Sequence, residues 1–366
     1  MNIAIFCNTP YQLMCAMNYT YHFKEKGCGR ADLYLGDNFS GFDKVYERVH
    51  KIDLFDNIYA YHPKKRKGSI ISNVERFLNI ISPKRCLNSF LREPNVYQNK
   101  KYDKILTSIA SYIAVAMIFT FPEAEVEYYD DGTGSYAREL SLCMISRIAI
   151  TINRLLGRDM NRIVPNKIFL NCPELASNEI RAKVHPLPSL REVSEELREL
   201  FRFVWDYQND GYYKKHRLIA LFSTNDTNDS GLDAFQGDAC KYLKDISENY
   251  LIRLHPRQNS DEYADYSLDE RRDMWELVCS DQLTEDNVLL AHYSTAQITP
   301  KMLHNNEPVL IFAYKAYSAG KLQERIQQVQ ETVDRLKASY RNKDRVIVPE
   351  TPEELWECVK KHNAKT

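Results

Sequence analysis

Short apolar runs alternate with amphipathic stretches along most of this chain of 366 residues. The apolar runs are rich in Ile, Leu, Val and Phe and end in polar loops, which is typical of strands buried in a parallel sheet. The stretches between them repeat apolar residues at the spacing of one helix face. Because strand and helix alternate, the sequence predicts an α/β fold built on doubly wound sheets.

The alternation of strand and helix occurs in two successive sets. The predicted strands are Asn2–Cys7, Asp32–Leu35, Asn57–Tyr61, Lys104–Thr107, Glu123–Tyr129 and Lys167–Leu170 in the first set, and Leu218–Phe222, Tyr250–Leu254, Val288–Ala291 and Pro308–Phe312 in the second. The chain is long for one hydrophobic core, so two domains are expected. We predict two Rossmann-like domains facing a central cleft, the architecture called GT-B. The predicted boundaries are an N-terminal domain at 1–190, a linker region at 191–215, a C-terminal domain at 216–350 and a final helix at 351–366.

The predicted helices lie between these strands. They span Leu13–Lys24, Phe42–Val49, Ser111–Phe119, Tyr136–Arg154, Leu190–Phe203, Gly237–Glu248 and Ile298–His304, with a terminal helix from Thr351 to Lys361. Pro300 is expected to be tolerated only in the first turn of its helix, because proline lacks an N–H donor.

One later stretch has a different apolar spacing. Its apolar positions are Leu322, Ile326, Val329, Val333 and Leu336. This alternation of steps of four and three is the a/d spacing of a coiled-coil seam. The stretch either packs on the protein's own surface or pairs with a second subunit, so a homodimer remains open.

Composition and charge narrow the class of protein. The net charge of -1 gives no support for nucleic acid as the main partner. The nine cysteines form no CxxC pair and no Cys/His cluster at zinc spacing, so no metal site is predicted. An odd cysteine count, with no signal-peptide pattern at the N-terminus, favours reduced thiols and a cytoplasmic location.

Two segments bear on contact with a membrane. The most apolar segment, 105–121, contains Thr and Ser and falls short of a membrane span, so it is interpreted as a buried helix. The basic run 64–67, with Arg76, Lys84 and Arg85 nearby, is either a solvated loop or a contact with the anionic inner face of the membrane.

Candidate chemistry begins with two adjacent carboxylates, Asp130 and Asp131, followed by Gly132. They come directly after a predicted strand, and ligands bind at the carboxyl ends of strands in open α/β sheets. A plain turn is the alternative, since Asp-Gly is a common turn dipeptide. Adjacent carboxylates often differ in pKa, which suits one general base and one structural partner. The sequence leaves open which of the two is the base.

Other polar loops also follow predicted strands. They are Asn8–Gln12, Ser223–Asp226, His255-Pro256 and Ser294-Thr295. Where such a loop starts a helix, the free N–H groups offer a site for an anion or a hydroxyl. Thr9 and Ser294 are explained equally well as helix caps, and His255 as a structural group at a strand end.

The order of these short motifs resembles that of the bacterial sialyltransferases. Those enzymes carry an acidic pair followed by Gly, then His-Pro, then Ser-Ser/Thr, as do Asp130-Asp131-Gly132, His255-Pro256 and Ser294-Thr295. The loop Asn8–Gln12 is similar to the strand-1 loop of family 52 glycosyltransferases, the lipooligosaccharide sialyltransferase group. The resemblance covers landmarks over most of the chain. It implies inverting transfer of sialic acid from CMP-sialic acid to a glycan hydroxyl, with no metal and no further cofactor.

The resemblance also implies roles for individual residues. Asp131 would be the general base, Asp130 would position it, and His255 would donate a proton or hydrogen bond to the departing phosphate. The remaining candidate substrate contacts are Asn8, Thr9, Gln12, Gly132, Ser223, Thr224, Asn225, Arg253, Pro256, Ser294, Thr295 and Glu307. Among them, Glu307 is the candidate for holding the ribose.

The sequence leaves other donors and roles open. The alternative is a GT-B transferase that uses CMP-Kdo, CMP-legionaminic acid or a UDP-sugar. A catalytically inactive nucleotide- or glycan-binding protein is a further alternative. For a transferase, the expected acceptor is a terminal galactose-type glycan of a lipooligosaccharide or capsule.

Overall fold

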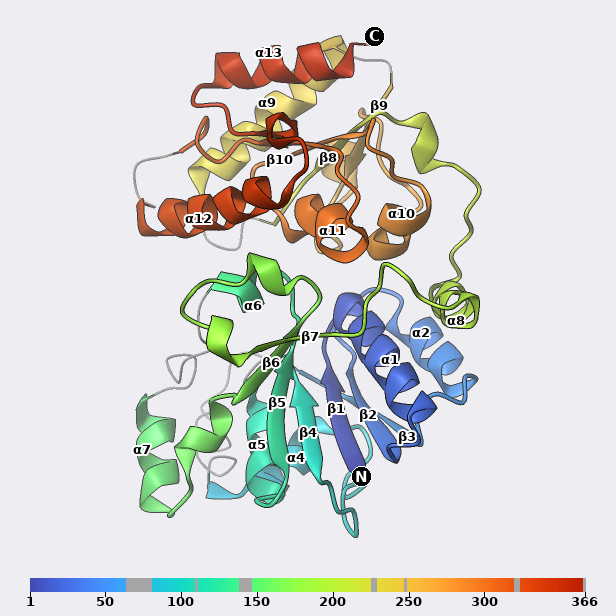
Figure 1. Ribbon diagram of the computed structural model, residues 1–366, viewed down its shortest axis with the longest axis vertical. Coiled ribbons are helices and arrows are strands. Elements are labelled where there is room, and N and C mark those ends of the chain that lie inside the picture. The colour runs from blue at the N-terminus through green and yellow to red at the C-terminus, as the bar shows by residue number, and fades with distance from the viewer. Residues whose placement is uncertain are drawn as a thin grey trace. The chain divides into compact units, whose positions relative to one another are not determined.

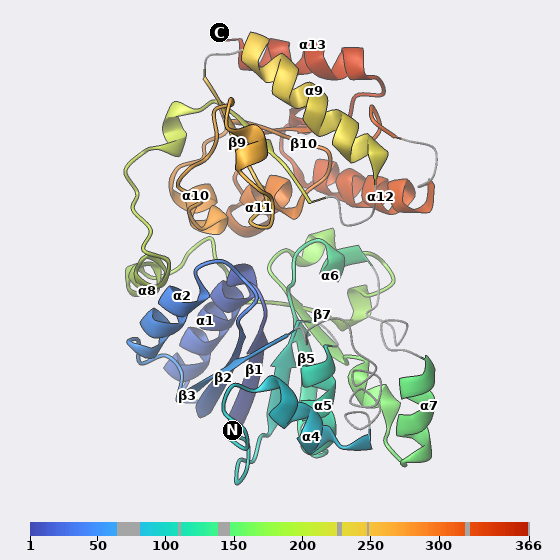
Figure 2. The ribbon, with the colours of Figure 1, turned by 180° about the vertical axis from the view of Figure 1, so that it is seen from behind.

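The computed structural model describes residues 1–63, 81–108, 111–137, 147–224, 229–246, 249–318 and 323–364. Within these ranges the chain forms two compact units, Met1–Val204 (unit 1) and Trp205–Thr366 (unit 2). Each unit contains a parallel sheet flanked by helices, as Figures 1 and 2 show. The two doubly wound sheets predicted from the sequence are therefore confirmed. The basic run 64–67 and Arg76 lie outside the described residues.

The sheet of unit 1 has the strand order β3-β2-β1-β4-β5-β6-β7. Its strands are β1 (Asn2–Cys7), β2 (Arg30–Gly36), β3 (Asn57–Tyr61), β4 (Lys104–Thr107), β5 (Glu125–Tyr129), β6 (Lys167–Leu170) and β7 (Val184–Pro186). The order reverses between β1 and β4, because β2 and β3 continue to one side and β5 to β7 to the other. Ligands bind at such a switch point, beyond the carboxyl ends of the strands.

Helices fill the connections of unit 1. They are α1 (Pro10–Glu25), α2 (Phe42–His50), α4 (Pro83–Phe90), α5 (Tyr112–Thr120), α6 (Gly134–Ala137), α7 (Arg147–Leu155) and α8 (Glu195–Trp205), with short 3-10 helices at Met160–Ile163, Pro173–Leu175 and Arg181–Lys183. Helix α1 connects β1 to β2 and helix α5 connects β4 to β5, and these two connections run in opposite directions along the sheet. Because parallel crossovers are right-handed, α1 and α5 lie on opposite faces of the sheet (Figures 1 and 2).

Unit 2 repeats the design with the strand order β12-β11-β10-β8-β9, which reverses between β8 and β10. Its strands are β8 (Leu218–Leu221), β9 (Tyr250–Arg253), β10 (Val288–Ala291), β11 (Val309–Phe312) and β12 (Val346–Ile347). Its helices are α9 (Ser230–Ile246), α10 (Trp275–Asp281), α11 (Thr295–His304), α12 (Gln323–Ser339) and α13 (Pro352–Asn363), with 3-10 helices at Tyr213–Lys215, Asp261–Tyr263 and Lys343–Arg345.

Helices α9 and α13 cover one face of the sheet in unit 2. Phe235 of α9 and Leu355 of α13 are fully buried in one cluster with alternate residues of four strands, such as Ala220 and Ile252. Burying apolar side chains of this size stabilises a fold by about 1.5–3 kcal/mol each. Helix α10 packs against α11 elsewhere in the unit.

Several elements differ from the sequence-based expectation. The helices α4 and α10 and the strands β7 and β12 were not predicted, since β7 contains a proline and β12 has only two residues. The predicted helix Tyr136–Arg154 is described only as α6 and α7, and residues 138–146 between them lie outside the described residues. The expected linker region 191–215 contains α8, whose buried face belongs to unit 1.

The heptad stretch packs partly within unit 2. Val333 and Leu336 of α12 are buried, while Ile326 and Val329 are half-buried. Leu322 lies outside the described residues. Of the five apolar positions of the heptad stretch, Val333 and Leu336 are therefore buried by packing of α12 within its own unit. Among the described helices, none is both long and apolar enough to cross a bilayer.

Pro300 does not lie in the first turn of its helix, which corrects the expectation. Helix α11 starts at Thr295, so proline removes the N–H that would normally reach the carbonyl of Ala296. The indole Nε1 of Trp275 donates to that carbonyl instead, at 2.7 Å. A tertiary hydrogen bond thus replaces the helical one, which is why the helix continues through proline.

Replacement of Trp275 by Phe is expected to lower the free energy of unfolding by about 0.5–1.5 kcal/mol, because the half-buried Ala296 carbonyl then loses its hydrogen bond. In a Pro300→Ala background the residue-300 N–H supplies that donor, so the same Trp275→Phe change should cost clearly less. Urea denaturation of the four proteins measures this coupling. Equal losses in both backgrounds would show that the indole bond does not substitute for the missing N–H.

Candidate active site

The carboxyl edge of the sheet in unit 1 gathers polar residues from three strands. Asn8 follows β1, Asp130 follows β5 and Asn171 follows β6. Strands β1 and β5 both neighbour β4, and β6 neighbours β5, so these loops adjoin. In the sequence, the loops that contain Asn8 and Asp130 were identified because each follows a predicted strand. The same placement would also have identified Asn171, which we did not single out.

Asp130 is fully buried and is surrounded by hydrogen-bond donors. Its Oδ1 accepts the main-chain N–H of Gly132 at 2.9 Å, and its Oδ2 accepts the main-chain N–H of Asn171 at 3.0 Å and the hydroxyl of Tyr136. Gly132 adopts φ +89°, a conformation that favours glycine and lets its N–H turn back to the carboxylate. Burial raises the pKa of Asp130, and these donors oppose that rise. Asp130 therefore ties the loops together.

Asp131 has a different environment. It is only partly buried, and its Oδ1 accepts one side-chain hydrogen bond, from Nε2 of Gln12. Its main-chain N–H donates to Oγ of Ser135 at 3.0 Å. Burial raises the pKa of Asp131 to about 6, with Gln12 lowering it and the Asp130 charge raising it. A carboxylate with this proton affinity suits a general base near neutral pH, and the geometry favours Asp131 over Asp130 for that role.

The first turn of α1 borders Asp131. Thr9 is its N-cap, because Oγ1 accepts the N–H of Gln12 at 3.2 Å, and Pro10 occupies the first turn, so the helix begins three residues before the predicted start at Leu13. The side chains of Thr9 and Gln12 are thus engaged with the protein itself. Tyr11, which the sequence did not identify, accepts a hydrogen bond from Nδ2 of Asn171 at 2.9 Å and so closes the loop of β6 against α1.

In unit 2 the switch point lies between β8 and β10. Ser294 caps α11 by accepting the N–H of Ala296 at 3.3 Å, and Thr295 is half-buried as the first helical residue. The cap and a phosphate site are compatible, since a helix start has four N–H groups without helical partners.

His255 follows β9, the outer neighbour of β8. Its Nδ1 accepts the main-chain N–H of Arg257 at 3.2 Å, so in the neutral ring the proton is on Nε2. Its own main-chain N–H donates to Oε1 of Gln258 at 2.9 Å. Pro256 is exposed. The ring is therefore oriented with Nε2 as a hydrogen-bond donor.

The loop after β8 contacts the loop after β9. The carbonyl of Ser223 accepts from Nε2 of Gln236 at 2.7 Å, and Oγ1 of Thr224 accepts from Arg257 at 3.4 Å. Both Ser223 and Thr224 are half-buried. Asn225 lies outside the described residues.

Arg253 is committed to the interior of unit 2. Its guanidinium forms an ion pair with the buried Asp269, donates to the carbonyl of Asp273 and lies 5.0 Å from the ring centroid of Trp275. These contacts join β9 to α10. They indicate a structural cation and leave the predicted phosphate contact without support from the geometry.

Glu307 corrects a sequence-based prediction. It precedes β11, and the register of Val288 with Val309 places it at the amino edge of the sheet. Ser294 follows β10 at the carboxyl edge, and the four-residue strands that separate the two edges are about 13 Å long. Its carboxylate accepts from Lys301 Nζ at 2.6 Å and from the N–H of Arg341 at 3.0 Å. Glu307 is thus a buried structural acid. Proximity to the last core strand misled the prediction, because Glu307 precedes that strand and ligands bind beyond the carboxyl ends of strands.

The donor set of the Asp pair suits hydrogen bonding better than metal binding. Both oxygens of Asp130 already accept main-chain N–H groups, and Asp131 Oδ1 accepts from Gln12. Among the residues that the structure describes, no cluster of three or more His, Cys, Asp or Glu side chains forms a potential metal site.

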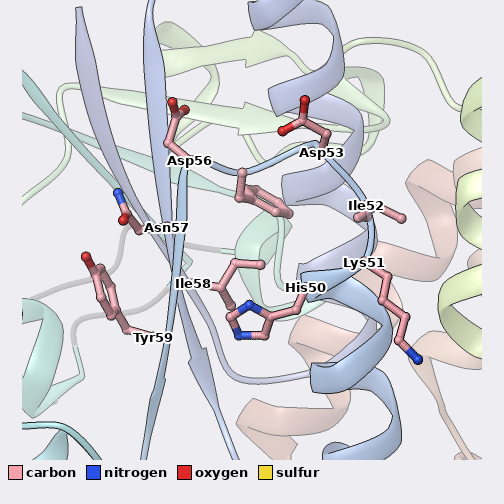
Figure 3. A pocket seen from close by; sticks show the side chains of 9 residues that line it. His50, Lys51, Ile52, Asp53, Asp56, Asn57, Ile58 and Tyr59 are labelled. Carbon is pink, nitrogen blue, oxygen red and sulfur yellow. The ribbon is translucent and has the colours of Figure 1, made fainter.

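A hollow of about 410 Å³ lies at the other edge of the sheet in unit 1. Figure 3 shows its lining, which comes from the end of α2 and the start of β3. The labelled side chains are His50, Lys51, Ile52, Asp53, Asp56, Asn57, Ile58 and Tyr59. Because β3 starts here, the hollow belongs to the amino edge and is separate from the Asp pair.

Asp130→Asn is expected to lower the free energy of unfolding by about 1–3 kcal/mol, because either orientation of the amide turns its NH2 group against a main-chain N–H. Asp131→Asn is the matched control. Because folding raises the pKa of Asp131 to about 6, Asp131 is ionised at pH 8 at a cost to the stability of the folded state, so replacing it by the neutral Asn should leave stability unchanged or increase it. Thermal unfolding at pH 8 compares the two. Similar losses in both variants would contradict the division of roles.

Comparisons with known proteins bear on the fold. No protein-family model matches the chain, and no curated protein matches it by sequence. A 2,6-sialyltransferase from Photobacterium sp. JT-ISH-224, solved with CMP and lactose, is similar in structure with a TM-score of 0.55 and 11% identity over 95% of this chain and 78% of that chain. The glycosyltransferase of kitacinnamycin has a TM-score of 0.54 and 12% sequence identity, over 100% of this chain and 91% of that chain. A Listeria monocytogenes protein described as a UDP-N-acetylglucosamine 2-epimerase has a TM-score of 0.50 and 10% sequence identity, over 99% of this chain and 95% of that chain. The chain therefore has the α/β fold of the GT-B enzymes, with two parallel sheets, a fold shared by sialyltransferases, other glycosyltransferases and epimerases.

Proposed function

We propose that this protein is an inverting, metal-independent sialyltransferase. It moves sialic acid from CMP-sialic acid to a hydroxyl of a terminal galactose-type glycan, carried on a lipooligosaccharide or capsule. The observation that carries the proposal is Asp131, a carboxylate at the carboxyl edge of a switch-point sheet whose pKa is raised to about 6. A GT-B enzyme that transfers a sugar to a hydroxyl needs such a base.

The reaction assigned to unit 1 is activation of the acceptor. A sugar hydroxyl is a poor nucleophile, so Asp131 takes its proton as the oxygen forms a bond to the anomeric carbon of the donor. Attack on the face opposite to the leaving group inverts that carbon. Asp130 keeps the loop in place through the N–H groups of Gly132 and Asn171.

The reaction assigned to unit 2 is departure of CMP. The bond between the anomeric carbon and the phosphate oxygen breaks, and both electrons leave with the phosphate. His255 Nε2 is a donor because Nδ1 is occupied, so it can stabilise or protonate that oxygen. Ser294 and the first N–H groups of α11 are the proposed phosphate contacts.

Two lines of support favour sialic acid as the transferred sugar. The three short motifs occur in the order found in bacterial sialyltransferases, and Asp131, His255 and Ser294 all lie at carboxyl edges of their sheets. The structurally similar Photobacterium enzyme was solved with CMP and lactose. These observations support CMP as the leaving group and a galactose-type acceptor.

CMP release from CMP-sialic acid tests the proposal directly. We expect release that depends on lactose, continues in EDTA, and falls about 10²–10⁴-fold in both Asp131→Ala and His255→Ala. Asp53→Ala, at the opposite edge of unit 1, is the control and should retain wild-type turnover. Loss of turnover in EDTA, or full activity in Asp131→Ala, would overturn the mechanism.

The pH profile tests the identity of the base. Because Asp131 must be ionised and its pKa is raised to about 6, kcat/KM should fall about tenfold per pH unit below pH about 6 and level off above it. An ordinary aspartate would place this acid limb near pH 4. Steady-state rates between pH 4.5 and pH 8 separate the two cases, and a limb near pH 4 would show that the base is a carboxylate with an ordinary pKa and not the partly buried Asp131.

A transferase with another activated sugar is the second candidate. It is favoured by the equally close likeness to the kitacinnamycin glycosyltransferase. The same assay with CMP-Kdo, CMP-legionaminic acid and UDP-sugars distinguishes the donors. CMP that raises the melting temperature without turnover of any donor would instead indicate a nucleotide-binding protein.

A further inference from the structure

The side-chain amide of Gln12 has a fixed orientation. Gln12 is 1% exposed, and its Oε1 accepts the main-chain N–H of Asn8 at 2.6 Å. A main-chain N–H can only donate, so the oxygen must face Asn8 and the NH2 group must face the other way. That NH2 group donates to Oδ1 of Asp131. The amide therefore joins the loop after β1 to the loop after β5.

Asn8 is itself held from a third strand. The hydroxyl of the fully buried Tyr61, at the end of β3, donates to Oδ1 of Asn8 at 2.7 Å. Gly36, at the end of β2, leaves room for this side chain. A Cβ at position 36 would lie 3.0 Å from Asn8 Oδ1 and 2.7 Å from Cγ of Pro63. The contacts thus run from Tyr61 to Asn8, then to Gln12 and Asp131.

We propose that Gln12 is the positioning residue of Asp131, and that Tyr61 and Asn8 hold Gln12 in the orientation this requires. The inference rests on the proposed function, in which Asp131 takes the acceptor proton, and deepens it. It replaces the sequence-based prediction that Asn8 and Gln12 contact the substrate. We name the series Tyr61, Asn8, Gln12 and Asp131 the amide relay.

The relay has two effects on Asp131. By holding Oδ1, it fixes the rotation of the carboxylate, and among the described residues Oδ2 has no hydrogen-bond partner, which leaves it for the acceptor hydroxyl. Burial and the Asp130 charge both raise the pKa of Asp131. The NH2 group of Gln12 donates to the ionised carboxylate and thereby lowers that pKa. Without it, Asp131 would be protonated at a higher pH.

The proton affinity of Asp131 can be measured without any substrate. In the full chain labelled with ¹³C at the aspartate carboxyl carbons, Asp131→Asn identifies the resonance of Asp131. We expect its titration midpoint to rise by about one pH unit in Gln12→Met, which removes the donor at similar size. The rise should be larger in Gln12→Glu, which places a second carboxylate against Asp131.

Two further variants separate positioning from general loss of structure. Tyr61→Phe leaves Gln12 in place and removes the hydroxyl that donates to Asn8 at 2.7 Å and contacts the carbonyl of Cys7 at 3.3 Å, so a smaller rise in the same direction is expected. Gln282→Met is the matched control, because Gln282 is equally buried but bonds Tyr213 and Tyr207 in unit 2. It should leave the Asp131 titration unchanged even if it lowers the melting temperature.

Each outcome decides the question. A midpoint that stays within about 0.2 pH unit of wild type in both Gln12→Met and Gln12→Glu would overturn the relay, whatever the activity. If Gln12→Met does not fold, Gln12→Glu and Tyr61→Phe carry the test. If the midpoints shift as expected but no activated sugar is transferred, the relay stands and the proposed function fails. Where transfer occurs, the acid limb of kcat/KM should move with the midpoint in each variant.

Discussion

The buried carboxylate of Asp130 is the constraint on which the candidate site of unit 1 depends. It accepts hydrogen bonds from the loop of β5 through Gly132, from the loop of β6 through Asn171 and from α6 through Tyr136. A buried charge is stable only when donors replace the water it has lost, so the three segments must converge on it. The convergence places the next residue, Asp131, at the rim of the site, where partial burial alters its proton affinity.

Unit 2 uses a comparable principle with a cation. Arg253 lies between Asp269 and Trp275, and the indole of Trp275 in turn holds the Ala296 carbonyl in the first turn of α11. The strand that precedes His255 and the helix that Ser294 caps are therefore linked through one buried side-chain network. In both units a buried charged group joins neighbouring segments, and the residue proposed to act chemically follows that group closely in the sequence: Asp131 comes directly after Asp130, and His255 two residues after Arg253.

The sequence predicted the strands well, because apolar β-branched runs between polar loops have few alternatives. It also predicted the strand-end position of the Asp pair, and it offered the Thr9 cap as an alternative to substrate contact. It failed where the outcome depends on contacts far apart in the chain. No residue near Pro300 in the sequence indicates that the indole of Trp275 replaces its missing hydrogen bond, and none near Glu307 indicates that its carboxylate accepts the main-chain N–H of Arg341.

The same distinction applies to polar residues near the site. Gln12 and Asn8 have the side chains of ligand contacts, and only their partners across the sheet show that the protein uses them. Asn171 was overlooked because an isolated amide carries no motif, and Tyr11 was given no role although it lies within the loop Asn8–Gln12. Pairings between strands that are distant in sequence therefore hold most of the information that the sequence alone did not provide.

The indole of Trp275 makes the protein's own fluorescence a sensor of the start of α11. The chain has three tryptophans, and this one is buried, lies against a guanidinium and bonds the carbonyl next to the Ser294 cap. Indole emission depends on nearby charge and on the state of its N–H. Any ligand that reorders the first turn of α11 therefore has an optical signature already built into the chain, with no label required.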